Sequence, residues 1–478
     1  MPKRLAVLLL ALLLALSTIP ASAQTATPAS GPIYIVQEGD SLWDIAARFN
    51  VSVDDIVAAN GMASQDIFVG DRLIIPGLED LGMSGVLVTQ PVPFGESLQS
   101  LSRQYRIDPS ILRKLNHIVS PAELYAGYNL VILEQDQQTP LTSRASLGNN
   151  ETLLEMAVKA NTDPWTLAEI NDLSSPAAAL PGDLLYLPSG ETSAPASGLP
   201  AAFLAAEVDP LPLVQGATAQ IKVTTPASVT LAGSLGDKPL HFFPDTAGEP
   251  NPQDSHQTQV ALQGIHGMAD PGLYPLRIEA TLPDGSVQSF EQPVLVQAGN
   301  FLNEIINGVE PDTIDPAVTG PEDEWLFSEV ALVTPEKYWQ GIFRLPVDSD
   351  YCLKSFFGNR RSYNGGIFHS FHSGLDFGVC SPANPFAVYA PADGVVVFTG
   401  LKTVRGNATI IDHGEGVYSG LYHQAEVYVA VGDRVTAGQL IGKIGATGRV
   451  TGAHLHWDLF VNGIQVNPLK WLDESFPH

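Results

Sequence analysis

The pattern of apolar and polar positions changes twice along the chain. Residues 34–188 combine short strand-like runs with helical stretches such as 42–49, where apolar side chains recur every three or four positions. Short β-type runs separated by Gly, Pro, Asp and Asn follow from 219 to 296, and they return from 339 onward. The pattern therefore predicts small α+β modules followed by two β-rich domains.

The first stretch contains an internal repeat. Each copy predicts a strand, two helices and a strand, with Asp40 or Ser41 capping the first helix and Asn60 near the end of the second. Leu42, Asn60 and Gly70 recur at nearly constant spacing as Leu98 and Leu153, Asn116 and Asn171, and Gly127 and Gly182.

The repeats resemble the LysM domain, a small βααβ module. The first copy carries "YIVQEGDSLWDIAARF", "IVAANG" and "VGDRLIIP"; the second keeps "GESLQSLSRQY", "LRKLNHI" and "LVIL". The third keeps "ETLLEMAVKANTD", "LAEIND" and "PGDLLYLP". The resemblance implies three LysM modules, at 34–76, 87–133 and 144–188.

LysM domains bind glycans that contain N-acetylglucosamine, in a shallow groove between their strand–helix and helix–strand loops. In the first copy the resemblance implies a glycan-binding role for residues of these loops: Gly39, Asp40, Ser41, Leu42 and Asn60. Asn149 and Asn150 stand in the third copy where the first has Gly and Asp. Several weak copies on short linkers would raise the apparent affinity for a glycan. Pure scaffolding is the alternative role of the repeats.

The middle of the chain shows no catalytic pattern. A linker rich in Pro, Ser and Gly spans 189–200, and strands every 8 to 12 residues predict an Ig-like β-sandwich spacer at 201–298. The acidic connector 299–338 is interpreted as solvated. The alternative is that one of its carboxylates covers the site of the last domain and inhibits it.

The last domain, 339–478, concentrates the chemistry. Alternation along a predicted strand at 454–461 places His454, His456 and Asp458 on one face. Upstream, His372 stands four residues before Asp376. Together these residues can offer His/Asp/His ligation to zinc with a fourth position open for water, as in catalytic zinc sites.

Residues 342–472 resemble the M23 (LytM/lysostaphin-type) family of zinc metallopeptidases, which cut peptidoglycan stem peptides or cross-bridges. The family motifs stand here as "FHSGLDFG", "GVYSGLYHQ" and "GATGRVTGAHLHWDL". The resemblance implies a mainly antiparallel β domain and one Zn²⁺ held by His372, Asp376 and His456. It also implies that His423 and His454 are the catalytic residues, and which of them is the general base stays open.

A basic turn precedes these motifs. Arg360, Arg361 and Tyr363 in "FGNRRSYN" can line the cleft and bind a carboxylate of a peptide substrate. An exposed basic turn without a ligand explains the same residues equally well.

Charge and the N-terminus narrow the functional class. The formal net charge of −27 argues against a nucleic-acid partner, which requires basic patches. Residues 1–23 combine Lys3 and Arg4, an apolar run from Leu5 to Leu16 and a small-residue cleavage site, which predicts a signal peptide rather than a membrane anchor. We therefore expect an exported protein without a membrane span after cleavage, located in the cell wall, the periplasm or outside the cell.

The chain has two cysteines, Cys352 and Cys380. Export favours a disulfide between them, and two free thiols or a thiolate metal ligand are the alternatives.

Taken together, the sequence predicts an exported peptidoglycan hydrolase that is targeted by LysM repeats and acts through a zinc endopeptidase domain. Two alternatives stay open: a non-catalytic wall-binding activator of another hydrolase, and a zinc peptidase that acts on secreted proteins.

Overall fold

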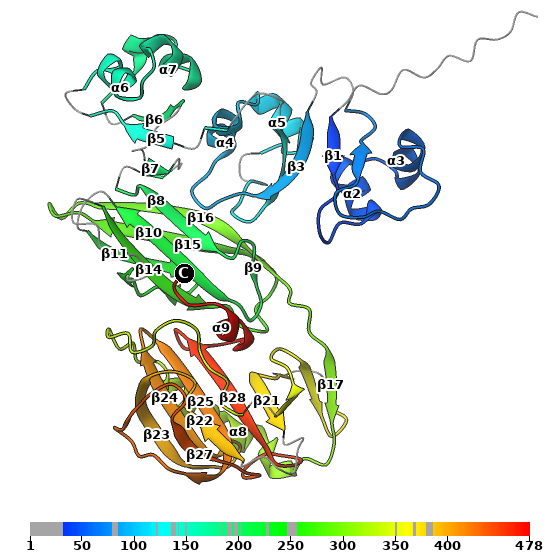
Figure 1. Ribbon diagram of the computed structural model, residues 1–478, viewed down its shortest axis with the longest axis vertical. Helices are drawn as coiled ribbons and strands as arrows, with labels where there is room; N and C mark the ends of the chain where they lie inside the picture. Colours follow the sequence, from blue (N-terminus) through cyan, green and yellow to red (C-terminus); the bar gives the residue numbers. More distant parts are fainter. Residues whose placement is uncertain are drawn as a thin grey trace, which may run out of the picture. The chain divides into compact units, whose positions relative to one another are not determined.

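The computed structural model describes most of the chain (Figure 1). The described residues are 32–78, 85–120, 123–134, 140–141, 143–148, 151–181, 183–188, 194–195, 199–200, 202–225, 229–245, 256–348, 351–366, 370–378 and 386–478. The predicted signal peptide, Asn149, Asn150, Gly182 and Cys380 lie outside them. The chain divides into two compact units, 1–88 with 131–138, and 89–130 with 139–478.

The first unit contains the first repeat. Its elements are β1 (Ile33–Ile35), α2 (Leu42–Phe49), α3 (Val53–Ala59) and β2 (Arg72–Ile74). β1 pairs antiparallel with β2 and parallel with the start of β3 (Val86–Pro91). Helix α2 begins where the Ser41 side chain accepts a hydrogen bond from the Asp44 amide, and it ends at Asn50 in the left-handed conformation. The apolar stripe of α2 is buried, as its period predicts.

The recurring asparagine has a structural role. The Asn60 side chain donates to the carbonyls of Ile56 in α3 and Ile74 in β2, at 2.8 Å each, and accepts from the Ile74 amide at 2.7 Å. Asn171 makes the same three bonds in the third repeat, two of them to Tyr186. The asparagine therefore joins the second helix to the returning strand, which explains its constant position in the repeat.

The second and third repeats have the same order of elements. The second consists of β3, α4 (Leu98–Tyr105), α5 (Pro109–Leu115) and β4 (Asn129–Glu134). The third consists of β5 (Ser143–Ser146), α6 (Leu153–Lys159), α7 (Pro164–Ile170), the 3-10 turn η3 (Pro176–Ala178) and β6 (Leu184–Leu187), and β5 also pairs with β7 (Ala194–Pro195). Capping boxes at Ser97 and Thr152 begin the first helix of each.

Two sheets with one shared core follow. One has the order β13-β14-β10-β8, from β8 (Ala205–Asp209), β10 (Thr218–Thr225), β13 (Phe243–Pro244) and β14 (Gln257–Gly264). The other has the order β12-β11-β15-β16-β9, from β9 (Leu213–Val214), β11 (Thr230–Leu235), β12 (Lys238–Pro239), β15 (Gly272–Thr281) and β16 (Val287–Gln297). We refer to this pair of sheets as the spacer.

The second repeat contacts the spacer through two of its loops. The Gly95 amide donates to the Gln292 side chain at 2.8 Å, and this side chain donates to the Glu96 carbonyl at 3.0 Å, both as buried bonds. Ala126 exchanges backbone hydrogen bonds with residues 293 and 295, at 2.9 and 3.0 Å. Phe94 meets Phe290 edge-to-face. These loops are the counterparts of the predicted glycan-binding loops of the first repeat.

The connector 299–338 is folded, in contrast to the solvated segment that the sequence predicted. It forms β17 (Asn303–Ile306), the 3-10 turn η4 (Pro311–Thr313) and α8 (Pro316–Glu329). Glu322 of α8 is buried, and its carboxylate accepts from the Val404 amide at 2.9 Å and from the Arg405 amide at 3.0 Å. Leu326 and Val330 enter the core of the last domain. The connector is therefore part of the last domain's packing.

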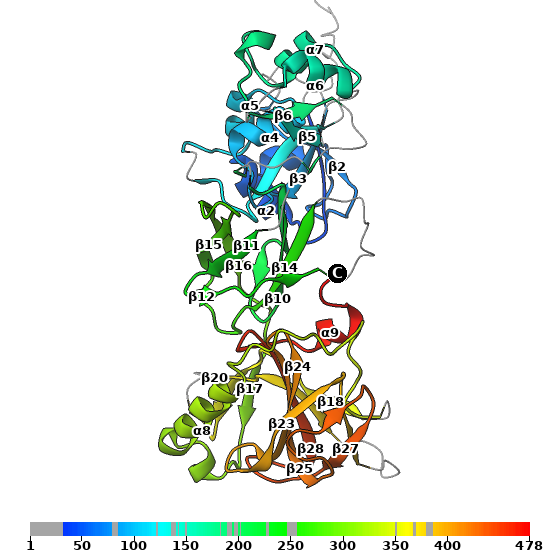
Figure 2. The same ribbon diagram turned by 90° about the vertical axis from the view of Figure 1, so that its left-hand side faces the viewer.

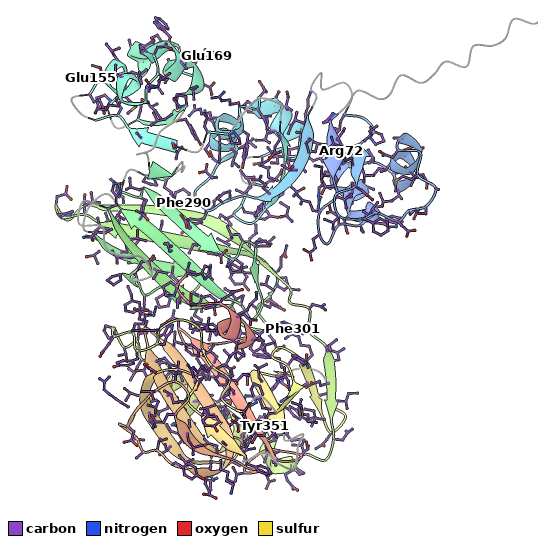
Figure 3. The ribbon with its side chains drawn as sticks, in the orientation of Figure 1. Arg72, Glu155, Glu169, Phe290, Phe301 and Tyr351 are labelled. Carbon is purple, nitrogen blue, oxygen red and sulfur yellow. The ribbon has the colours of Figure 1, made fainter. Side chains whose placement is uncertain are left out.

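The last domain is built on one large antiparallel sheet, turned to a second view in Figure 2. Its main path is β18-β21-β28-β25-β24-β23-β26, and three buried tryptophans, Trp339, Trp457 and Trp471, share its core. The strands of this sheet are β18 (Cys352–Ser355), β21 (Gly374–Gly378), β22 (Ala387–Tyr389), β23 (Gly394–Lys402), β24 (Gly406–Gly414), β25 (Val417–Val427), β26 (Arg434–Val435), β27 (Leu440–Ile444), β28 (His454–Val461) and β29 (Ile464–Val466). β17, β19 (Arg360–Tyr363) and β20 (Ser370–Phe371) form a small separate sheet, and α9 (Leu469–Asp473) follows β29. Figure 3 adds the side chains, with Tyr351 of this domain labelled.

Two further findings bear on the sequence predictions. Cys352 is disulfide-bonded, and the described residues hold no free cysteine. Among the described residues, no helix is both long enough and apolar enough to cross a membrane.

A buried histidine makes the stability of this domain depend on pH. His413 is fully buried; its Nδ1 donates to the Asp393 carbonyl at 2.8 Å, and its Nε2 lies 2.9 Å from Ser419 Oγ. Burial lowers the pKa of His413 from 6.5 to about 4. The unfolded chain therefore binds this proton more tightly than the folded chain. Stability from this group is present above pH 6.5 and is lost as pH falls toward 4, by about 3 kcal/mol in total.

We predict that His413→Gln flattens the fall in unfolding free energy between pH 6.5 and 4, because glutamine does not titrate. Urea unfolding followed by tryptophan fluorescence at several pH values measures this slope. His117→Gln, at an exposed histidine of the second repeat, is the control and should keep the wild-type slope. An unchanged slope in His413→Gln would contradict the assignment.

Candidate active site

Strand register brings the predicted ligands together. β21 pairs antiparallel with β28 so that Asp376 lies opposite His456, and His454 lies opposite Gly378. On the other side of β28, Tyr422 of β25 lies opposite His456. His372 follows β20, and its backbone exchanges hydrogen bonds with residues 358 and 359. One face of three neighbouring strands therefore carries the chemistry.

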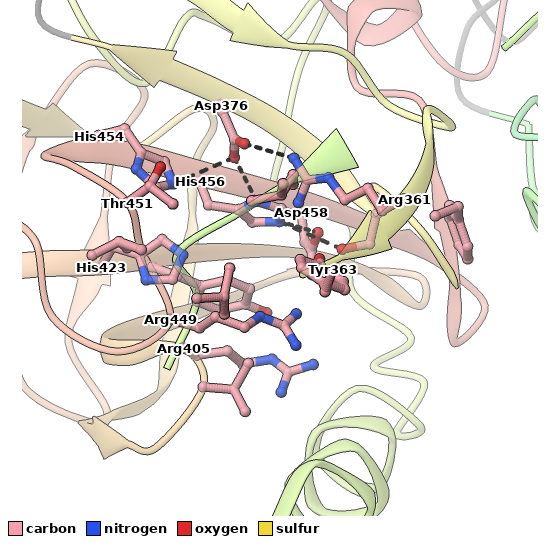
Figure 4. A pocket seen from close by; sticks show the side chains of 17 residues that line it. Arg361, Tyr363, Asp376, Arg405, His423, Arg449, Thr451, His454, His456 and Asp458 are labelled. Carbon is pink, nitrogen blue, oxygen red and sulfur yellow. Dashed lines mark hydrogen bonds and ion pairs between the residues drawn. The ribbon is translucent and has the colours of Figure 1, made fainter. Parts of the chain in front are cut away.

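Three ligand atoms converge at the centre of this site. His372 Nε2 lies 3.0 Å from Asp376 Oδ1 and 3.0 Å from His456 Nδ1, and Asp376 Oδ1 lies 2.8 Å from His456 Nδ1. All three side chains are buried, and together they could hold a metal ion. Figure 4 shows Asp376 and His456 facing each other in the pocket, with His454 alongside.

Hydrogen bonds on the outer side of each ring fix the inward-facing nitrogens. His372 Nδ1 donates to the Phe356 carbonyl at 2.9 Å, because a carbonyl oxygen can only accept. His456 Nε2 donates to Asp458 Oδ1 at 2.6 Å, and Gln465 donates to the other oxygen of Asp458 at 3.1 Å. When both imidazoles are neutral, each therefore points a lone pair at the Asp376 carboxylate. This tautomer control from the outer partner is typical of histidines that bind metals.

The pKa shifts show that the site favours a positive charge. Burial alone would raise the pKa of Asp376, but His372 and His456 hold it well below its ordinary value. Burial disfavours the charged form of His456, yet Asp458 and Asp376 raise the pKa of its imidazole to about 9. These shifts have the direction expected for a site that favours a cation between the two imidazoles and the carboxylate.

The residues present fit zinc. Four ligands at 2.0–2.1 Å on a tetrahedron stand about 3.3 Å apart, close to the observed separations of the three ligand atoms. The donor set of two imidazoles and one carboxylate is also one that zinc accepts.

Two further histidines lie beside this group. The rings of His423 and His454 are 4.8 Å apart, and His454 Nε2 lies 3.7 Å from Asp376 Oδ1. Their Nδ1 atoms donate to backbone carbonyls, of Thr447 at 2.8 Å and of Gly452 at 2.9 Å, which leaves both Nε2 atoms free to accept a proton. Burial, and then the neighbouring His454 and His456, hold the pKa of His423 well below its ordinary value, so that its ring is neutral at pH 7.

A backbone irregularity aims His423 into the pocket. Strict alternation would send Tyr422 and His423 to opposite faces of β25, yet both line the pocket. His423 adopts φ +63°, and the pairing of β25 with β24 shifts register between Asn407 and Thr409. Such an irregularity re-aims a side chain next to an active site.

A cluster of Arg361, Glu304 and Ser355 contacts Asp376 and His372. Arg361 donates to Asp376 Oδ2 at 2.9 Å and to Glu304 Oε2 at 3.1 Å. Ser355 Oγ lies 3.0 Å from His372 Nδ1 and donates to Glu304 at 2.8 Å. Glu304 comes from the connector, so the connector reaches the site through Arg361 and Ser355.

The structure separates the residues of the predicted basic turn. Arg361 and Tyr363 line the pocket, whereas Arg360 donates to the Gly267 carbonyl at 2.8 Å and to Gln215 at 3.0 Å, both in the spacer. Arg361 is already paired with two carboxylates, and Arg360 does not line this pocket. Of these three residues, Tyr363 therefore remains the best placed to meet a substrate.

Several pocket residues carried no sequence signal. Arg405, Arg449 and Thr451 line the pocket from turns, and Glu304 and Ser355 support it from separate segments. Asp458 could be anticipated, because it shares the strand face of His454 and His456. His369, three residues before His372, lies outside the described residues.

The loops of the first repeat are held by internal contacts. Asp40 accepts from the Tyr34 hydroxyl at 2.7 Å, and Leu42 is buried in the core. Gly39 adopts φ +86°, Ser41 caps α2 and Asn60 joins α3 to β2. The neighbouring apolar side chains are exposed instead: Trp43 is 74% and Phe68 72% exposed.

Comparison with known proteins finds family matches in the N-terminal and C-terminal parts of the chain. Residues 370–468 match the model of peptidase family M23, and residues 34–76 and 92–132 match the LysM domain. The chain therefore carries a peptidase family M23 domain and LysM domains, which confirms the two resemblances. The third repeat is not part of the LysM match.

Similar proteins include peptidoglycan DD-endopeptidase ShyA of Vibrio cholerae, 40% identical over 129 residues, 27% of this chain and 29% of that protein. DD-carboxypeptidase/endopeptidase Mpg of Neisseria meningitidis is 40% identical over 106 residues, 22% of this chain and 24% of that protein. The chain thus spans less than a third of the length of these curated relatives. The catalytic domain of lysostaphin from Staphylococcus simulans is 30% identical, with a TM-score of 0.23, over 26% of this chain and 93% of that one.

We predict that Asp458→Asn weakens Zn²⁺ binding about 10- to 100-fold, because the carboxylate charge that orients and polarises His456 is lost. Competition with a chromogenic chelator measures the affinity. Asp473→Asn, at an exposed carboxylate of the same domain, is the control. Equal affinities of Asp458→Asn and wild type would exclude this supporting role.

Proposed function

We propose that the protein is an exported peptidoglycan hydrolase whose M23 domain is a zinc-dependent endopeptidase. The observation that carries the proposal is the convergence of His372 Nε2, His456 Nδ1 and Asp376 Oδ1 on one point, with His423 and His454 beside it. Two lone pairs and a carboxylate at this spacing are a cation site, and free histidines next to it suit proton transfer. The M23 match supports the same reading.

His372, Asp376 and His456 would hold one Zn²⁺, which when bound polarises a carbonyl and lowers the pKa of water toward ~7. Of the protein's own groups, His423 or His454 accepts a proton at Nε2 and can return it to the leaving amine. The other ring can donate a hydrogen bond from Nε2 to the oxygen on which negative charge develops when it is an imidazolium, because its Nδ1 proton is held by a backbone carbonyl. Because its lowered pKa keeps the His423 ring neutral at pH 7, its Nε2 lone pair is available for the acceptor role.

The proposed substrate is a peptide bond in peptidoglycan. LysM domains and an M23 domain occur in one chain, and two similar proteins are named as peptidoglycan or DD-endopeptidases. A cell-wall, periplasmic or extracellular location follows from that substrate.

We further propose a division of roles among the modules. The third repeat, 144–188, is a LysM module because it has the same elements and the same asparagine contacts as the first. The spacer, 201–298, is an Ig-like sandwich, and the connector and peptidase domain span 299–338 and 339–478. In the second repeat, the loops that correspond to the glycan groove are engaged by the spacer. The first repeat, with Trp43 and Phe68 exposed beside its loops, is the main glycan-binding module.

We predict that the zinc-loaded protein releases cross-linked or stem-peptide fragments from purified peptidoglycan and that His454→Ala does not. Mass spectrometry of the muropeptides identifies the bond. The activator alternative predicts a different outcome. The protein would bind peptidoglycan and zinc without cleaving peptidoglycan, and its His456→Ala variant would still increase the activity of another hydrolase. Cleavage of secreted proteins without muropeptide products would establish the other alternative.

We predict that Trp43→Ala combined with Phe68→Ala lowers retention of the full chain on insoluble peptidoglycan several-fold, because both side chains lie exposed beside the groove loops. Val119→Ala, at an 85% exposed position of the second repeat, is the matched control and should bind as wild type. Equal retention of all three proteins would exclude the first repeat as the main glycan-binding module.

A further inference from the structure

Three arginines line the active-site pocket, and two of them are already neutralised. Arg361 pairs with Asp376 at 2.9 Å, and Arg405 pairs with Glu322 at 3.1 Å. Each of these two arginines also contacts a second carboxylate. The third is Arg449, and no ion pair joins it to an acidic group of the described residues. Arg449 is therefore a source of uncompensated positive charge in the pocket.

Contacts hold the Arg449 side chain in place without consuming its charge. Its guanidinium carbon lies 4.8 Å from the ring centre of Tyr363, and Nη1 donates to the Thr313 carbonyl at 3.1 Å. The side chain is half-buried, and Figure 4 shows it beside Tyr363 and below His423. A guanidinium has five N–H donors, and among the described residues one of them has an acceptor. An edge of the group stays available for a ligand.

The loop that carries Arg449 also orients a catalytic histidine. The Thr447 carbonyl, two residues earlier, accepts the hydrogen bond from His423 Nδ1. The Arg449 amide donates to the Val404 carbonyl at 2.8 Å. Gly448 adopts φ +77°, and a Cβ there would lie 2.4 Å from the Gly406 amide nitrogen. The loop is therefore fixed against β24. Because two residues of backbone span at most about 7 Å, the Cα atom of Arg449 lies within that distance of the Cα atom of Thr447.

We propose that Arg449 binds a free carboxylate of the substrate peptide, located within one or two residues of the scissile bond. An arginine fork matches a carboxylate in two parallel hydrogen bonds, and Tyr363 behind it keeps the plane of the fork in place. The net charge of −27 disfavours the binding of an anion elsewhere on the protein. The uncompensated charge of Arg449 can therefore direct a carboxylate to this pocket. The inference rests on the proposed peptidase function and adds the specificity of its site.

The test uses two uncleavable peptides that differ at one group, a carboxylate or a carboxamide next to the position of the scissile bond. Binding of each to the zinc-loaded full chain is measured by calorimetry. The wild type should bind the carboxylate peptide about 10- to 100-fold more tightly, as expected for a hydrogen bond to a charged group. In Arg449→Gln this preference should fall to about one, and Arg449→Lys should keep part of it because the charge remains but the fork is lost.

Arg434→Gln is the matched control. Arg434 also lies over a tyrosine, 5.2 Å from the ring centre of Tyr338, but it is exposed and does not line the pocket. This variant should keep the wild-type preference. A carboxylate preference that survives in Arg449→Gln, or that is absent from the wild type, would overturn the proposal. The calorimetry measures binding without turnover. Failure to cleave peptidoglycan would therefore contradict the proposed function, whereas the carboxylate preference would still decide the role of Arg449.

Discussion

The site depends on one electrostatic constraint: two imidazole lone pairs and a carboxylate face one another at about 3 Å inside the protein. This arrangement is unfavourable unless a positive charge lies between the groups. The antiparallel register of β21 and β28 creates it by placing Asp376 opposite His456. The outer hydrogen bonds to Phe356 and Asp458 then prevent either ring from turning its proton inward. The fold thus maintains a local arrangement that a bound cation would stabilise.

Much of this arrangement could be predicted because it is encoded in local sequence. Alternation along 454–461 predicted that His454, His456 and Asp458 share a face, and all three line the pocket. The repeat spacing predicted the strand, helix, helix, strand order, since each module forms from contiguous residues. The two family resemblances rest on motifs that are also contiguous.

What the sequence did not reveal depends on contacts between distant segments. The pairing of Glu304 with Arg361 joins residues 57 positions apart, and that of Glu322 with Arg405 joins residues 83 apart. No periodicity marks such partners. The acidic composition of the connector suggested solvation, but two of its carboxylates, those of Glu304 and Glu322, pair with arginines of the last domain. Net charge per segment is therefore a poor guide to burial when the compensating charges come from elsewhere.

The packing of the last domain begins earlier in the chain than its motifs suggest, because it includes the connector. The M23 match begins at residue 370, yet each of the three pocket arginines has a partner before residue 330: Glu304 for Arg361, Thr313 for Arg449 and Glu322 for Arg405. A fragment that begins at residue 370 would keep His372, Asp376 and His456 and would lose the three groups that contact the pocket arginines. The segment that sets the charge of the pocket is thus longer than the segment that carries the family motifs.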